Sequence, residues 1–181
     1  MKKLIASGAV VGCLLFGVQA VVAQTADVHG KAASSAQSKS GAKAEANRSV
    51  SADPWVGSWK MDVSRSRLHG PAPQEETLVI ESVAGGDIKY SLKSVGQDSQ
   101  YTITYDGKSD SAAPVLVDGK EAGTATYHRV NSRQYSGKSK MSSGLTTTET
   151  IELSPNHKQL TVTVHARQAE GEYDETAVYT R

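Results

Sequence analysis

Apolar and polar residues alternate in short runs along most of the chain, from residue 55 to the last residue. In the segment QLTVTVHA, for example, aliphatic residues occupy the even-numbered positions of 160–166 and polar residues occupy the odd-numbered positions. Because successive side chains of a β-strand point to opposite faces, this alternation predicts a strand with one apolar face and one polar face.

Turn-forming residues separate ten such runs, which are the predicted strands. No ten-residue stretch after residue 70 shows the 3.6-residue period of an amphipathic helix, although a single helical turn fits 63–68. Gly85-Gly86, Asp106-Gly107 and Asp118-Gly119 suit tight hairpins with positive φ, and Ser154-Pro155-Asn156 suits a longer turn. The predicted strands are 55–62, 75–82, 87–95, 99–105, 113–117, 124–130, 133–140, 145–153, 159–166 and 173–181.

Regular strand spacing over residues 53–181 predicts one all-β, antiparallel, up-and-down domain of about eight to ten strands. One face of each strand is apolar and the other is polar, as in a sandwich or a barrel. Closure into a barrel removes exposed strand edges, so we favour a barrel over a sandwich, which the pattern alone also permits.

The first 23 residues have the features of a secretory signal peptide. Lys2 and Lys3 precede an apolar run, and small residues ending at Ala23 suit cleavage before Gln24. A membrane-spanning helix is the alternative, but the run is short, contains glycines and lacks a basic flank. Lipoprotein processing at Cys13 is a second alternative, although apolar residues continue after this cysteine. We therefore expect an exported, periplasmic or extracellular protein without an integral membrane span.

Residues 24–52 contain two valines and no leucine, isoleucine or aromatic residue. Such a stretch cannot offset its ordering entropy by burial, so it is expected to be a disordered tether rich in Ala, Ser and Lys. Removing Lys2 and Lys3 with the signal peptide leaves 18 of the 20 basic residues against 19 acidic ones. This balance gives no strong field for nucleic acid. The processed chain also lacks cysteine, so its stability must come from burial.

Both tryptophans lie at the first predicted strand. The tripeptide Gly57-Ser58-Trp59 resembles the G-x-W signature that opens the first strand of lipocalins and related calycin barrels. The stretches GSWKMDVSRSRL, LSPNHKQLTVTV and AVYTR resemble exported bacterial lipocalin-like domains over residues 55–181. The resemblance implies that Trp59 closes one end of a barrel and that Arg181 packs across its ring, with Arg167 as the competing arginine. Without the resemblance, Trp55 and Trp59 are simply large core residues.

The sequence lacks the signature motifs of serine hydrolases and zinc proteases, and it lacks those of dinucleotide-binding and phosphate-binding loops. The histidines have no metal-ligand spacing, so no metal site or cofactor is expected, and no catalytic residue is assigned. Glu75-Glu76 and Asp174-Glu175 are neighbouring carboxylates that would point to opposite faces of a strand, and they are expected to be solvated. An enzyme is therefore the least supported class.

Tyrosine is the main aromatic residue of the processed chain, and it suits a cavity lined by apolar rings with polar hydroxyls. The same residue type is also common on ordinary strand faces. Shared strand faces make Tyr90, Leu92, Tyr101 and Ile103 the candidate ligand-lining residues. The leading functional hypothesis is therefore a barrel that binds a small, partly apolar molecule in its interior. The alternative is a non-catalytic module with a side-chain-filled barrel that docks to another cell-envelope protein.

Overall fold

The computed structural model describes residues 53–181, which form a closed antiparallel barrel of ten strands. Each strand pairs with its neighbours in sequence, and the last strand pairs with the first. The predicted signal peptide (1–23), with Cys13, and the predicted tether (24–52) lie outside the described residues. The strands are β1 (Gly57–Met61), β2 (Glu75–Ser82), β3 (Ile88–Val95), β4 (Gln100–Gly107), β5 (Ala113–Val117), β6 (Lys120–Asn131), β7 (Gln134–Met141), β8 (Thr146–Leu153), β9 (Gln159–Gln168) and β10 (Gly171–Thr180).

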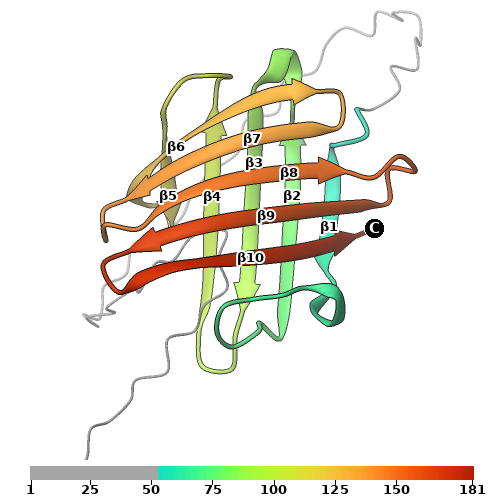
Figure 1. Ribbon diagram of the computed structural model, residues 1–181. Helices are drawn as coiled ribbons and strands as arrows, with labels where there is room; N and C mark the ends of the chain where they lie inside the picture. Colours follow the sequence, from blue (N-terminus) through green and yellow to red (C-terminus); the bar gives the residue numbers. More distant parts are fainter. Residues whose placement is uncertain (1–52) are drawn as a thin grey trace, which may run out of the picture. The chain divides into compact units, whose positions relative to one another are not determined.

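The barrel has two layers of strands that cross steeply, with β6–β10 in front of β1–β5 in the view of Figure 1. The longest connection within the barrel, between β1 and β2, contains a short 3-10 helix at Val63–Arg65. Part of this connection runs beside β10, where Arg67 forms a β-bridge with Thr176. The connection therefore continues the wall of the barrel beyond the end of the short strand β1.

The fold class predicted from the alternating pattern is confirmed. The Asp118-Gly119 hairpin has the expected positive φ at both residues, 48° and 77°. The tight turn predicted at Asp106-Gly107 is wrong, because β4 continues through Gly107 and the positive φ occurs later, at Asp110. A Gly is needed at 107 for a different reason: a Cβ there would lie 2.0 Å from the hydroxyl oxygen of Tyr105.

Alternate residues of each strand fill the barrel interior, and most of them are apolar. The buried polar residues include three carboxylates, and two of these correct the expectation that the neighbouring acidic pairs are solvated. Glu76 and Glu175 are 3% and 2% exposed, because they occupy the inward face of β2 and β10. Their neighbours Glu75 and Asp174 point outward and are exposed. Glu149, the third, is 2% exposed on β8.

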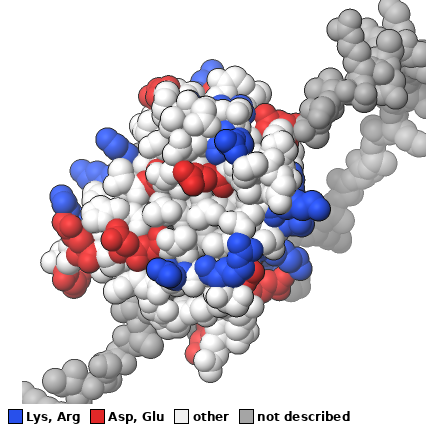
Figure 2. Space-filling view, turned by 45° about the vertical axis from the view of Figure 1, so that its right-hand side comes forward, with Lys and Arg blue, Asp and Glu red and all other residues white. Residues whose placement is uncertain are grey.

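The outer surface carries both signs of charge. Figure 2 shows Lys and Arg intermixed with Asp and Glu over the face in view, without an extended region of one sign. Among residues 53–181, no helix has the length and apolar character needed to cross a membrane.

Candidate ligand-binding interior

Both tryptophans lie at or just before the start of β1, and neither side chain is exposed. Trp59 lies on β1, and its indole N–H donates to the carbonyl oxygen of Trp55 at 3.0 Å. Trp55 precedes the strand, and its own indole N–H donates to the carbonyl of Ser132 at 2.9 Å. The Trp55 ring also meets the ring of Tyr135 edge to face, with 5.0 Å between centroids. Both indoles therefore bury their rings and satisfy their polar atoms, which is the usual requirement for a buried tryptophan.

Arg181 packs against the Trp59 ring. Its guanidinium carbon lies 4.2 Å from the centroid of the Trp59 ring. The same guanidinium donates to the backbone carbonyls of Pro54 and Val56 at 2.8 and 3.1 Å, and its Nε donates to the carbonyl of His157 at 3.0 Å. The competing arginine of the sequence analysis, Arg167, instead lies exposed on β9, where it forms an ion pair with Glu172.

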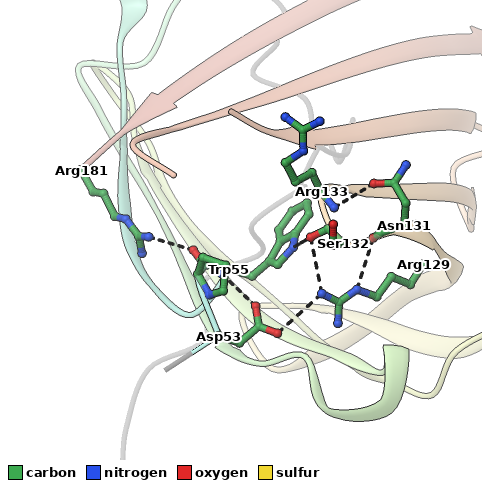
Figure 3. A network of polar contacts seen from close by, with 8 residues as sticks. Asp53, Trp55, Arg129, Asn131, Ser132, Arg133 and Arg181 are labelled. Atoms are coloured by element: carbon green, nitrogen blue, oxygen red, sulfur yellow. Dashed lines mark hydrogen bonds and ion pairs between the residues drawn. The ribbon is translucent and has the colours of Figure 1, made fainter. Parts of the chain in front are cut away.

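A second arginine ties the segment before β1 to the β6–β7 turn (Figure 3). Arg129 forms an ion pair with Asp53 at 3.6 Å, and Asp53 accepts the backbone N–H of Trp55 at 3.1 Å. The turn is held by Asn131, whose side chain accepts the backbone N–H of Arg133 at 2.8 Å. These contacts hold Trp55 in place beside Trp59 and Arg181, and we call these three residues the tryptophan cluster.

The interior is almost filled by side chains. Its cavity measures about 10 Å³, which corresponds to at most one water molecule. Seven buried side chains line it: Leu78, Ile80, Ile88, Tyr90, Tyr127, Ile151 and Val162.

A chain of hydrogen bonds crosses the interior beside this cavity. The hydroxyls of Tyr90 and Tyr127 lie 3.1 Å apart, and the Tyr127 hydroxyl donates to Glu149 at 2.9 Å. The other carboxylate oxygen of Glu149 accepts from the hydroxyl of Thr147 at 2.7 Å. Thr147 in turn lies 2.8 Å from the hydroxyl of Ser139. The chain joins β3, β6, β8 and β7, and each of its side chains is buried.

Burial controls the ionisation of the side chains in this hydrogen-bonded network. Removal from water raises the pKa of Glu149 to about 7, although the hydrogen bonds from Thr147 and Tyr127 favour its charged form. Burial, together with the nearby charge of Glu149, raises the pKa of Tyr90 and Tyr127 well above the ordinary range. The tyrosines therefore stay protonated, and Glu149 is the member of the chain that can change charge near neutral pH.

Three tyrosine rings form the apolar body of this cluster. The rings of Tyr90 and Tyr105 stack with 5.6 Å between centroids, and the Tyr127 ring meets Tyr105 edge to face at 5.0 Å. Tyr127 reaches this position because its cross-strand partner is Gly137, where a Cβ would lie 2.5 Å from a ring carbon of Tyr127. A side chain at 137 would thus displace the Tyr127 ring, whose hydroxyl links Tyr90 to Glu149.

A second group of buried carboxylates lies next to the connection between β1 and β2. Glu76 accepts the hydroxyl of Tyr179 at 2.6 Å, and Glu175 accepts the backbone N–H of His69 at 2.7 Å. Burial, opposed by this hydrogen bond and reinforced by the charge of Glu76, raises the pKa of Glu175 to about 7. The His69 ring stacks on Tyr173, with 4.1 Å between centroids.

The four candidate lining residues all occupy the inward face of β3 and β4, but they differ in position. Tyr90 lines the cavity and belongs to the hydrogen-bonded chain. Leu92 and Ile103 are cross-strand partners in the core, and neither lines the cavity. Tyr101 lies further along β4, opposite Ser94, and is partly buried. The structure thus brings only Tyr90 to the cavity itself.

Neither strand histidine lies in the interior. His128 and His165 are on the outer face of β6 and β9, and each pairs with an exposed aspartate, Asp110 and Asp174 respectively. Among residues 53–181, no group of three or more His, Cys, Asp or Glu side chains is arranged to hold a metal ion.

A surface hollow of about 420 Å³ lies outside the barrel at the ends of β7–β9. It is open to water and mostly polar, so it cannot desolvate an apolar ligand as an interior site would. Its lining consists of Asn131, Arg133, Gln134, Glu152, Leu153, Ser154, Pro155, Gln159 and Thr161.

Sequence reasoning missed the interior carboxylates Glu76, Glu149 and Glu175. The position of each carboxylate in its strand could have found them. Each carboxylate lies an even number of residues from apolar residues that face inward, as Glu149 does from Ile151.

Comparison of the chain with protein-family models gives no match, and comparison with curated proteins gives none either.

Proposed function

We propose that the barrel binds one small, partly apolar molecule in its interior, beside Tyr90 and Tyr127. The supporting observation is the hydrogen-bonded chain that crosses an otherwise apolar interior. Buried polar groups bring little net stability compared with apolar side chains of the same volume. A cavity with apolar walls and a few convergent polar groups is, by contrast, the usual composition of a small-molecule site.

The size of the cavity sets a condition on this function. Eight strands already enclose an interior that side chains can just fill, and a ten-stranded barrel is wider. Here the three tyrosine rings occupy much of that extra width. A ligand larger than water therefore requires rings of the cluster to change rotamer, and their hydroxyls then become available to the ligand.

Native mass spectrometry of the protein with a panel of lipids and aromatic metabolites tests this proposal. We expect one retained ligand per chain. Val162→Phe fills the cavity and should abolish retention, whereas Thr161→Phe adds the same ring on the outer face of β9 and should preserve it. Circular dichroism verifies that both variants fold. Absence of any retained ligand, or equal retention by both variants, contradicts interior binding.

A second candidate function is a non-catalytic interaction module of the cell envelope. The observation that favours it is the filled interior, since the 10 Å³ cavity holds no ligand without rearrangement. A barrel that retains nothing from the panel, but recovers one envelope protein in stoichiometric amount through its outer face, would support this module.

The proposed place of action is outside the cytoplasm, as an exported lipocalin-like domain. The signal-peptide pattern of residues 1–23 supports export, and the ten-stranded antiparallel barrel is compatible with the lipocalin resemblance. Sequencing of the mature N-terminus tests export: cleavage should leave Gln24 first, whereas a lipid-modified Cys13 indicates the lipoprotein alternative.

A further inference from the structure

Glu175 is a buried carboxylate with an unfilled acceptor atom. It points into the barrel from β10 together with Ala177 and Tyr179, and it is 2% exposed. Its Oε1 accepts the backbone N–H of His69 at 2.7 Å. Its Oε2 is also buried, and within residues 53–181 it has no hydrogen-bond partner. Most buried polar atoms in folded proteins are paired, so such an atom calls for an explanation.

The surroundings of Glu175 increase the free-energy cost of ionising its carboxyl group. Glu76 lies close enough for its carboxylate to disfavour ionisation of Glu175. No lysine or arginine within residues 53–181 forms an ion pair with Glu175. Two neighbouring buried carboxylates destabilise a protein unless a proton or a cation lies between them.

We propose that the Glu175 carboxylate, with Glu76 beside it, binds the ammonium or guanidinium group of the small molecule held in the barrel. This inference rests on the proposed interior binding function and specifies the chemical class of the ligand. An ammonium group carries three N–H donors and a full positive charge, so it fills the open Oε2 and neutralises the pair. A bare metal ion fits less well, because the described residues offer no set of three metal-ligating side chains.

The inward face of β2 connects the carboxylate pair to the cavity, which the apolar part of such a ligand would enter once the tyrosine rings move. Glu76, Leu78 and Ile80 share the inward face of β2, and the last two line the cavity. Two residues along a strand span about 7 Å, so the carboxylate pair and the cavity are separated by the length of a short aliphatic chain. A molecule with an apolar body and one cationic end can therefore contact both regions.

The connection between β1 and β2 lies against the carboxylate pair, so a ligand entering here would have to displace this connection. The backbone N–H of His69 contacts Glu175, and the His69 ring is exposed where it stacks on Tyr173. The cationic group would then lie beneath this connection, and the apolar body would extend along the inward face of β2 toward the cavity.

Isothermal titration calorimetry of the full chain with n-octylamine, n-octanol and octanoate at about pH 8 tests the inference, since the amine is then protonated and the acid is ionised. We expect octylamine to bind about ten-fold or more tightly than octanol, a difference of at least about 1.4 kcal/mol, and octanoate to bind most weakly. Glu175→Gln keeps the shape of the side chain and should remove the preference for the amine. Glu172→Gln makes the same change in charge at an exposed site of β10 and should keep it.

The outcomes separate the two proposals. Equal affinity for octylamine and octanol, with both lost in Val162→Phe, overturns the cation site and leaves interior binding intact. An amine preference that survives in Glu175→Gln overturns the assignment to this carboxylate. No binding of any of the three probes contradicts interior binding as well. Glu175→Gln is expected to fold, because it removes a buried charge, and its thermal unfolding provides the check.

Discussion

The guanidinium carbon of Arg181 lies over the Trp59 ring, 4.2 Å from its centroid. The same group holds the segment before β1 through the carbonyls of Pro54 and Val56. Arg181→Ala should therefore lower the free energy of unfolding by about 0.5 to 2 kcal/mol, through loss of the cation–π contact and its hydrogen bonds. Urea denaturation measures this loss. Arg181→Lys keeps the charge but not the fork of donors, so it should recover only part of the loss.

Replacement of Trp59 by alanine should be more damaging. The ring is fully buried, and its loss leaves a cavity in the core, so Trp59→Ala is expected to cost about 3 to 5 kcal/mol in urea denaturation. Val63→Ala is the control, because Val63 is 39% exposed and its truncation should change stability by less than about 0.5 kcal/mol. Equal unfolding midpoints for the two variants would show that Trp59 does not stabilise the barrel.

Gly57 combines a backbone requirement with a close contact. Its φ of 141° is one that side chains disfavour, and a Cβ would lie 3.2 Å from Nη1 of Arg181. Gly171 is a matched control, because its φ is 144° and nothing lies within 4 Å of a Cβ there. Both alanine substitutions should destabilise by about 1 to 3 kcal/mol through backbone strain, with Gly57→Ala the worse. The difference between the two should shrink in an Arg181→Ala background, and an unchanged difference would exclude the arginine as its cause.

Stability should fall as pH rises through neutrality. The pKa of Glu149 and of Glu175 is about 7 in the folded protein, above the ordinary value of 4.5. The folded state therefore holds these protons more tightly than the unfolded chain does. The contribution to stability is complete below the ordinary value and is lost as pH passes about 7. Urea denaturation at intervals between about pH 5 and pH 8 should show a decline, which Glu149→Gln should reduce without abolishing.

The hydroxyl of Tyr127 should contribute more to the free energy of unfolding than the hydroxyl of the neighbouring Tyr105. Tyr127→Phe removes the donor to Glu149, leaves a buried acceptor unfilled, and should cost about 1 to 3 kcal/mol. The pKa of Glu149 should rise further, because the lost bond favoured the charged form. Tyr105→Phe is the control, since within residues 53–181 the hydrogen bond of that hydroxyl is a long one, 3.3 Å to the carbonyl of Ala125. Carbon-13 NMR titration of the glutamate carboxyls would detect the shift, and identical titration curves would argue against the bond.

Alternation made most of this barrel predictable from sequence. The observed strands lie within a few residues of the predicted ones, because one apolar face per strand fixes both its location and its phase. The ends of the strands were less predictable. Asp106-Gly107 has the composition of a tight turn, yet Gly107 continues β4 because the Tyr105 ring lies over it. Composition alone does not distinguish a glycine that turns the chain from one that makes room for a ring.

The interior site was predicted only in part. Strand phase placed Tyr90 on the inward face, but sequence does not show which inward residues meet around a cavity. Sequence analysis also treated Glu76 and Glu175 as surface charge, a position that glutamate usually prefers. The phase of β2 and β10 outweighed that preference, because turning either glutamate outward would expose the apolar residues that share its face.

The seam between β1 and β10 joins only two residue pairs, Lys60 with Thr180 and Met61 with Tyr179. The adjoining β9–β10 ladder runs the full length of β10. Because the two strands of the seam are far apart in sequence, the ring cannot close during synthesis until β10 has been made. A nascent chain would therefore keep a free strand edge on β1 until β10 has been synthesised, and such an edge can pair with another chain and start aggregation.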